Sequence, residues 1–110
     1  MKGYHQNKTC IDACLQCAAI CNHCSANCLH GNNVQMMVRC IQLCNECAVL
    51  CYAAAQVMSM GGQTAKELCR ICADICDACA AECDGHENKH CKECADACRR
   101  CAEECRRMAG

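Results

Sequence analysis

The sequence predicts an all-α fold, an antiparallel up-down-up-down four-helix bundle with a cysteine-lined core. Cysteine supplies 20 of the 110 residues, and these fall into four groups in which neighbouring cysteines are three or four positions apart. This spacing is the a/d pattern of a heptad, and it places all thiols of a group on one face of an α-helix. Short turn sequences separate the groups, and the chain contains no proline to interrupt a helix.

The four helices are expected to include residues 10–28, 40–51, 69–83 and 91–105. A β-strand would require a period of two, which none of the groups has. In a bundle helix the a/d positions normally carry leucine, whereas here they carry thiols. These thiols are Cys10, Cys14, Cys17, Cys21, Cys24, Cys28, Cys40, Cys44, Cys47, Cys51, Cys69, Cys72, Cys76, Cys79, Cys83, Cys91, Cys94, Cys98, Cys101 and Cys105.

The segments between the groups have the residues of helix ends. Gly31 suits a left-handed cap after the first helix, and a Gly61-Gly62 pair follows the second. Thr64 with Glu67 has the spacing of a capping box, so the third helix is expected to start at Thr64. Connections this short make successive helices antiparallel. The sequence therefore predicts that residues 1–110 form a single four-helix-bundle domain.

Composition excludes two classes of partner. The formal net charge is −1 and no basic face stands out, which argues against nucleic acid. We see no run of about 18 apolar residues suited to a membrane. The N-terminal MKGYHQNKTC has neither an apolar signal region nor a twin-arginine stretch, so we expect a cytoplasmic protein whose thiols stay reduced.

Three uses of the thiols need to be compared. A few buried cysteines can serve as small apolar core residues, but packing gives no reason to use them at almost every a/d site. Ten disulfides would pair all 20 cysteines, yet a bundle of this length folds without them. A disulfide-stapled structural bundle remains an alternative, as does a redox protein with an iron–sulfur cluster. Binding of many soft metal ions explains the pattern best.

The charge of the filled core favours Cu(I) over Zn(II). Zinc takes four thiolates, so 20 cysteines would hold about five ions, each site carrying −2. Cu(I) accepts two or three thiolates, which can bridge ions, and one Cu(I) per thiolate leaves the core nearly neutral. The sequence therefore predicts a protein that sequesters many Cu(I) ions. A thiolate-based buffer for zinc or another soft metal is the alternative.

Both ends of the thiol stripes carry further donor atoms. In an antiparallel bundle the heptad continues from Cys83 to His86 and His90, and backwards from Cys40 to Met37. His86 and His90 are candidate metal ligands at this end, and solvated loop residues are the alternative. At the opposite end, Met58 and Met108 continue two stripes as an apolar plug or as weak thioether ligands.

The chain resembles the cytosolic branch of the bacterial copper storage proteins over nearly its whole length. The resemblance is carried by Cys21-Asn22-His23-Cys24, by Cys72-Ala73-Asp74-Ile75-Cys76, by the histidine-containing turn leading to His90-Cys91, and by the terminal CAEECRRMAG. It implies storage of many Cu(I) ions on thiolates inside each bundle, with ions entering at one end. It also implies a homotetramer and no enzyme activity, and His90 matches the family's histidine near the open end. Proteins that deliver or receive copper are not identified by the sequence.

Overall fold

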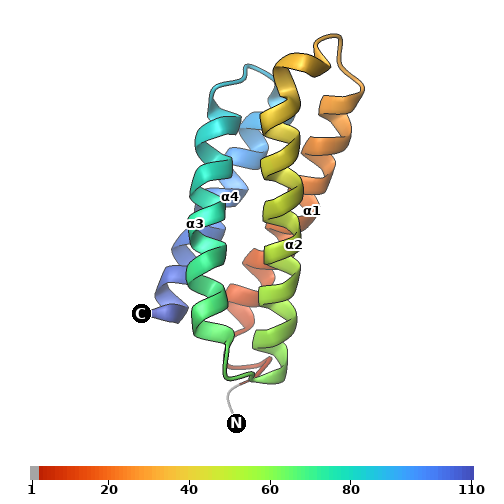
Figure 1. Cartoon of the computed structure of the whole chain (residues 1–110). Helices are drawn as coiled ribbons and strands as arrows, with labels where there is room; N and C mark the ends of the chain where they lie inside the picture. The colour runs from red at the N-terminus through yellow and green to blue at the C-terminus, as the bar shows by residue number, and fades with distance from the viewer. Residues whose placement is uncertain (1–2) are drawn as a thin grey trace.

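The computed structural model describes residues 3–110, and in that range the chain forms four long helices and no strand. The helices are α1 (Lys8–Leu29), α2 (Val38–Met60), α3 (Ala65–Asp84) and α4 (Lys89–Ala109). A short 3₁₀ helix, η1 (Val34–Met37), precedes α2. Successive helices run in opposite directions (Figure 1). The predicted up-down-up-down four-helix bundle is confirmed.

Two details of the helix ends differ from the prediction. Gly61, with φ of 67°, is the left-handed cap, and its N–H donates to the Met58 carbonyl at 3.1 Å. Gly31 is not left-handed, because α1 already ends on His30 in a right-handed conformation. Thr64 is the residue before α3, as expected, but its side chain makes no capping hydrogen bond. The prediction of a left-handed Gly31 and of a bonded capping box was therefore wrong.

The helices pack in a square around one axis. Each contacts its two neighbours, α1 with α2 and α4, and α3 with α2 and α4. The bundle measures 49 × 19 × 18 Å. Small residues such as Ala18, Ala48, Ala73 and Ala95 are buried beside the cysteines, so neighbouring backbones can approach closely. The result is a narrow, elongated core with the connections at its two ends.

One segment passes a simple composition test for a membrane span. Val34–Met60 is long and apolar enough, although 44% of its most apolar window is buried inside the protein. We had not expected any such segment. Its buried residues include Cys40, Cys44, Cys47 and Cys51, which face the other helices. Packing in the bundle core accounts for the cysteines of this segment, whereas apolar residues such as Val38 and Val49 are exposed.

Candidate metal centre

The 20 predicted site cysteines form one continuous column of sulfur along the bundle axis. All are free and buried, and 18 of them have no exposed surface. Along one helix, Cys17 and Cys21 Sγ atoms are 4.0 Å apart. Between neighbouring helices the distances extend down to 3.5 Å, between the Cys51 and Cys72 sulfurs. Every thiol stripe thus faces the axis, as the heptad spacing predicted.

Sulfur atoms also meet across the diagonal of the square. α2 and α4 are not neighbours, yet Cys44 Sγ lies 3.7 Å from Cys94 Sγ, and Cys51 Sγ lies 3.8 Å from Cys101 Sγ. A cysteine side chain is short, so such contacts require that the axis be filled by sulfur itself. No hydrocarbon layer separates the stripes at these levels.

The sulfurs gather into groups of four that could hold a metal ion. Within each group all Sγ atoms lie within 4.8 Å of one another. A tetrahedral ion with metal–sulfur bonds of about 2.3 Å would hold its sulfurs about 3.8 Å apart, which fits these groups. The groups include Cys14-Cys72-Cys101-Cys105, Cys17-Cys51-Cys76-Cys101, Cys17-Cys21-Cys47-Cys98, Cys21-Cys79-Cys94-Cys98 and Cys24-Cys40-Cys44-Cys83. Several cysteines belong to two groups, so filling all groups requires sulfurs that bridge ions.

Burial opposes ionisation of the thiols in the metal-free protein. Desolvation, with the neighbouring Cys40 and Cys28, raises the pKa of Cys91 to about 12, and burial likewise raises the pKa of Cys28. In the middle of the core, a hydrogen bond with Cys101 raises the pKa of Cys76 and another lowers that of Cys72. A thiol that donates to a neighbouring thiolate keeps its proton, whereas the accepting sulfur loses it more readily. Since an unperturbed thiol is already largely protonated at neutral pH, metal must displace protons from the core.

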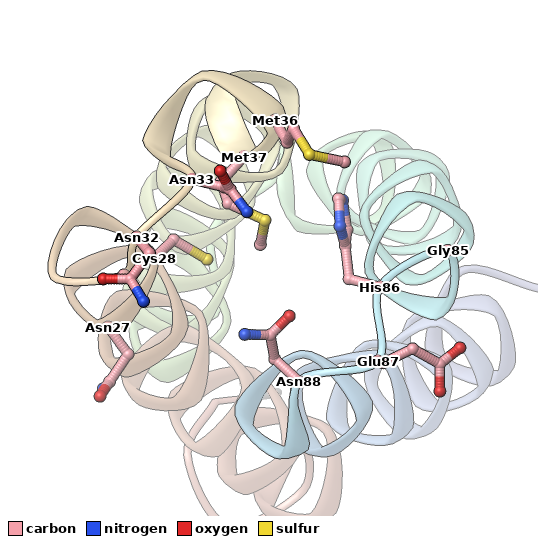
Figure 2. A pocket seen from close by; sticks show the side chains of 11 residues that line it. Asn27, Cys28, Asn32, Asn33, Met36, Met37, Gly85, His86, Glu87 and Asn88 are labelled. Atoms are coloured by element: carbon pink, nitrogen blue, oxygen red, sulfur yellow. The ribbon is translucent and has the colours of Figure 1, made fainter.

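The column opens at the end that joins α1 to α2 and α3 to α4. A pocket of about 420 Å³ lies there, and we call it the mouth. It is lined by Asn27, Cys28, Gly31, Asn32, Asn33, Met36, Met37, Gly85, His86, Glu87 and Asn88. Figure 2 shows Cys28, Met37 and Asn88 directed into the space between the helix ends, whereas Glu87 points away from it.

Of the two predicted histidines, His86 lines the mouth, and His90 lies next to it, against Cys28. His90 Nε2 is 3.5 Å from Cys28 Sγ, so this ring reaches the first sulfur of the column. His86 Nε2 is 2.9 Å from a carboxylate oxygen of Glu82. Because an ionised carboxylate only accepts hydrogen bonds, Nε2 donates in this contact, and in the neutral ring Nδ1 is the nitrogen with the free lone pair. Arg39 Nε approaches Glu82 at 3.7 Å from α2.

Comparisons with known proteins agree with this geometry. The family model described as copper storage protein matches residues 4–110. The chain belongs to the copper storage protein family. No curated protein sequence matches it.

Solved structures of copper storage proteins are similar over nearly the whole chain. The apo form of copper storage protein 3 from Bacillus subtilis is 45% identical, with a TM-score of 0.87 and coverage of 94% of this chain and 98% of that chain. The Cu(I)-bound copper storage protein BsCsp3 is also 45% identical, with a TM-score of 0.90 and coverage of 94% and 97%. A cytosolic copper storage protein from Streptomyces lividans with five coppers is 34% identical, with a TM-score of 0.91 and coverage of 94% and 91%.

Sequence reasoning missed Glu82 as the partner of His86 in this copper storage protein. The signal was present, since Glu82 precedes His86 by four positions and residues at this spacing meet on a helix surface. Arg39 could not be found in this way, because its proximity to Glu82 depends on how α2 packs against α3.

Proposed function

We propose that this protein stores many Cu(I) ions on the thiolates of its 20 cysteines, inside the four-helix bundle. The observation that carries the proposal is the overlap of the four-sulfur groups. Isolated sites would need separate sets of ligands, whereas Cys17, Cys21, Cys98 and Cys101 each belong to two groups. Thiolates that bridge ions suit Cu(I), which accepts two or three sulfur ligands.

Charge distinguishes copper from zinc where geometry does not. The four-sulfur groups have dimensions that also suit a tetrahedral zinc ion. In a core that is almost fully buried, however, each Zn(II) with four thiolates leaves −2 without solvation. One Cu(I) per thiolate cancels the charge of each sulfur. A zinc or other soft-metal buffer is the competing function.

The mouth supports uptake of ions at that end of the bundle. His90 reaches Cys28, and the neutral ring of His86 offers Nδ1 as a metal donor when Nε2 is bonded to Glu82. Met37 lies at the same pocket. We assign His86 and His90 as ligands that receive Cu(I) before it passes to the first thiolates.

A store accounts for the site better than an enzyme does. The sulfurs lie in a buried column, and the family's name indicates storage rather than catalysis. A disulfide-stapled structural bundle is the competing non-metal function, and the 20 cysteines are free thiols in this structure.

A similar protein supports the location, and an exposed apolar surface supports an assembly. The similar protein from Streptomyces lividans is described as cytosolic, which supports a cytosolic store here. We also propose a homotetramer. Apolar side chains exposed on α2, including Val38, Val49 and Tyr52, provide a surface suited to association between copies.

An anaerobic titration of the reduced protein with Cu(I), in competition with a chromophoric Cu(I) chelator, tests the proposal. We expect tight uptake approaching one ion per thiol, undisturbed by zinc. Saturation near five equivalents together with a preference for zinc would identify a zinc buffer. Thiols that are unreactive after aerobic purification, with no tight metal binding, would indicate a disulfide-stapled protein.

A further inference from the structure

The end of the bundle opposite the mouth continues the sulfur column with two methionines. Because neighbouring helices are antiparallel, one heptad step toward this end adds seven to positions in α2 and α4 and subtracts seven in α1 and α3. The buried group Cys17-Cys51-Cys76-Cys101 is a suitable starting point. One step from each of its members, in the same order, leads to Cys10, Met58, Cys69 and Met108.

The same rule can be checked in the other direction. One heptad toward the mouth gives Cys24, Cys44, Cys83 and Cys94. The first three belong to one four-sulfur group, and the Cys44 and Cys94 sulfurs are 3.7 Å apart. The step therefore connects sets of side chains that meet at the axis.

Both methionines take part in the core. Met58 is fully buried in the core cluster, which contains all 20 cysteines, and Met108 packs against that cluster. Met108 and Cys10 also line one pocket of about 220 Å³, together with Gln6, Asn7, Thr9, Glu104 and Arg107. Cys10, at 5% exposure, is the most exposed of the 20 cysteines, ahead of Cys28 at the mouth with 2%. This end of the column is therefore in reach of solvent.

The chemistry of the four side chains fits one soft ion. Two thiolates around Cu(I) give a net charge of −1, and two further thiolates would raise this to −3. Methionine thioethers are soft donors that remain neutral at every pH, so they complete the coordination of Cu(I) without adding charge. α2 supplies no thiol beyond Cys51, and Met58 occupies the position one heptad further on.

We propose that Cys10, Cys69, Met58 and Met108 form a mixed thiolate–thioether site for Cu(I) at this end of the bundle. The inference rests on the proposed storage function and adds a site that differs from the all-thiolate sites. Thioethers hold Cu(I) more weakly than thiolates do. The ion in this site consequently exchanges more readily with the adjacent pocket, which makes it a second port to the column.

Selenium in place of the methionine sulfur provides a direct test. Met36 and Met37 lie at the mouth, so the protein is prepared with selenomethionine and with Met36→Leu and Met37→Leu substitutions, then loaded with Cu(I) under anaerobic conditions. Leucine conserves side-chain volume at each changed position. We expect copper–selenium scattering at the selenium absorption edge. Adding Met58→Leu and Met108→Leu should abolish it and lower the copper content by about one ion. Met60→Leu, at an exposed position on the same helix, should leave both unchanged.

The outcomes separate this site from the storage function. Full copper loading without copper–selenium scattering would overturn the mixed site and leave the store intact. Scattering that persists after both core methionines are replaced would also overturn it. Failure of the protein to take up Cu(I) at all would refute the storage function, and the mixed site with it. The first measurement needs no change at Met58 or Met108, so the test does not depend on how those variants fold.

Discussion

Replacing Cu(I) by Zn(II) should expose the cost of unbalanced charge in the sulfur column. The α1 stripe from Cys10 to Cys28 spans 18 residues, or about 27 Å at 1.5 Å per residue. Five Zn(II) sites of charge −2 spread over that length would lie about 7 Å apart. At an effective dielectric constant of about 20, two neighbouring sites repel by roughly 10 kcal/mol. Each factor of ten in affinity corresponds to about 1.4 kcal/mol, so a filled neighbour weakens the next site by several orders of magnitude.

We therefore expect zinc to saturate well below five ions per chain, with affinities that fall steeply from one ion to the next. Cu(I) should load toward one ion per thiol without such a fall. Parallel anaerobic titrations, with chelator competition and elemental analysis of the desalted protein, measure both quantities. Uptake of five zinc ions of equal affinity would refute the charge argument, since it would show that the core tolerates a charge of about −10.

Three further predictions concern individual residues. Burial raises the pKa of Cys91 to about 12, so the protonated Cys91 thiol stabilises the metal-free protein below about pH 8.5, and this stabilisation is lost as the pH rises toward 12. Urea unfolding followed by circular dichroism should show a lower midpoint at pH 10.5 than at pH 7. Equal midpoints would contradict this. Glu82→Gln should slow Cu(I) uptake about tenfold at unchanged capacity, because it removes the carboxylate that orients His86. Stopped-flow traces that match those of the control Glu87→Gln would argue against that role. Cys76→Ser should lower the copper capacity by one or two ions, and it should lower the free energy of unfolding by about 1–3 kcal/mol if the buried hydroxyl lacks a partner. Ala73→Ser, also buried on α3, controls for the hydroxyl. An unchanged copper content in Cys76→Ser would exclude Cys76 from the sites.

The sequence was sufficient to predict the column because one residue type marks the core. Cysteine spacing of three and four defined the inward face of each helix, and the structure buries every one of those thiols. The short turns then fixed the antiparallel order. In most helical bundles the core positions are harder to predict from the sequence, since ordinary apolar residues are also found on surfaces.

Features that depend on backbone detail or on packing between helices could not be predicted. Gly31 and Gly61 both follow a helix, but only Gly61 adopts the left-handed conformation, because His30 and not Gly31 is the residue that caps α1. The approach of Arg39 to Glu82 joins two helices whose relative rotation the heptad fixes only approximately. Contacts across the diagonal of the bundle likewise depend on the separation of the helices, which the neighbouring alanines help to set.

The choice of cysteine over leucine has a physical explanation that links folding to storage. A protonated thiol is a small apolar group, so the metal-free core can pack while its burial opposes ionisation. When Cu(I) replaces the proton, one positive charge is exchanged for another, and the net charge of the core does not change. The alanines beside the thiols keep the helices close enough for sulfurs to meet across the diagonal. The same side chains can therefore form the core of the empty bundle and the binding surface of the filled one, and the fold need not be rebuilt as ions are added or removed.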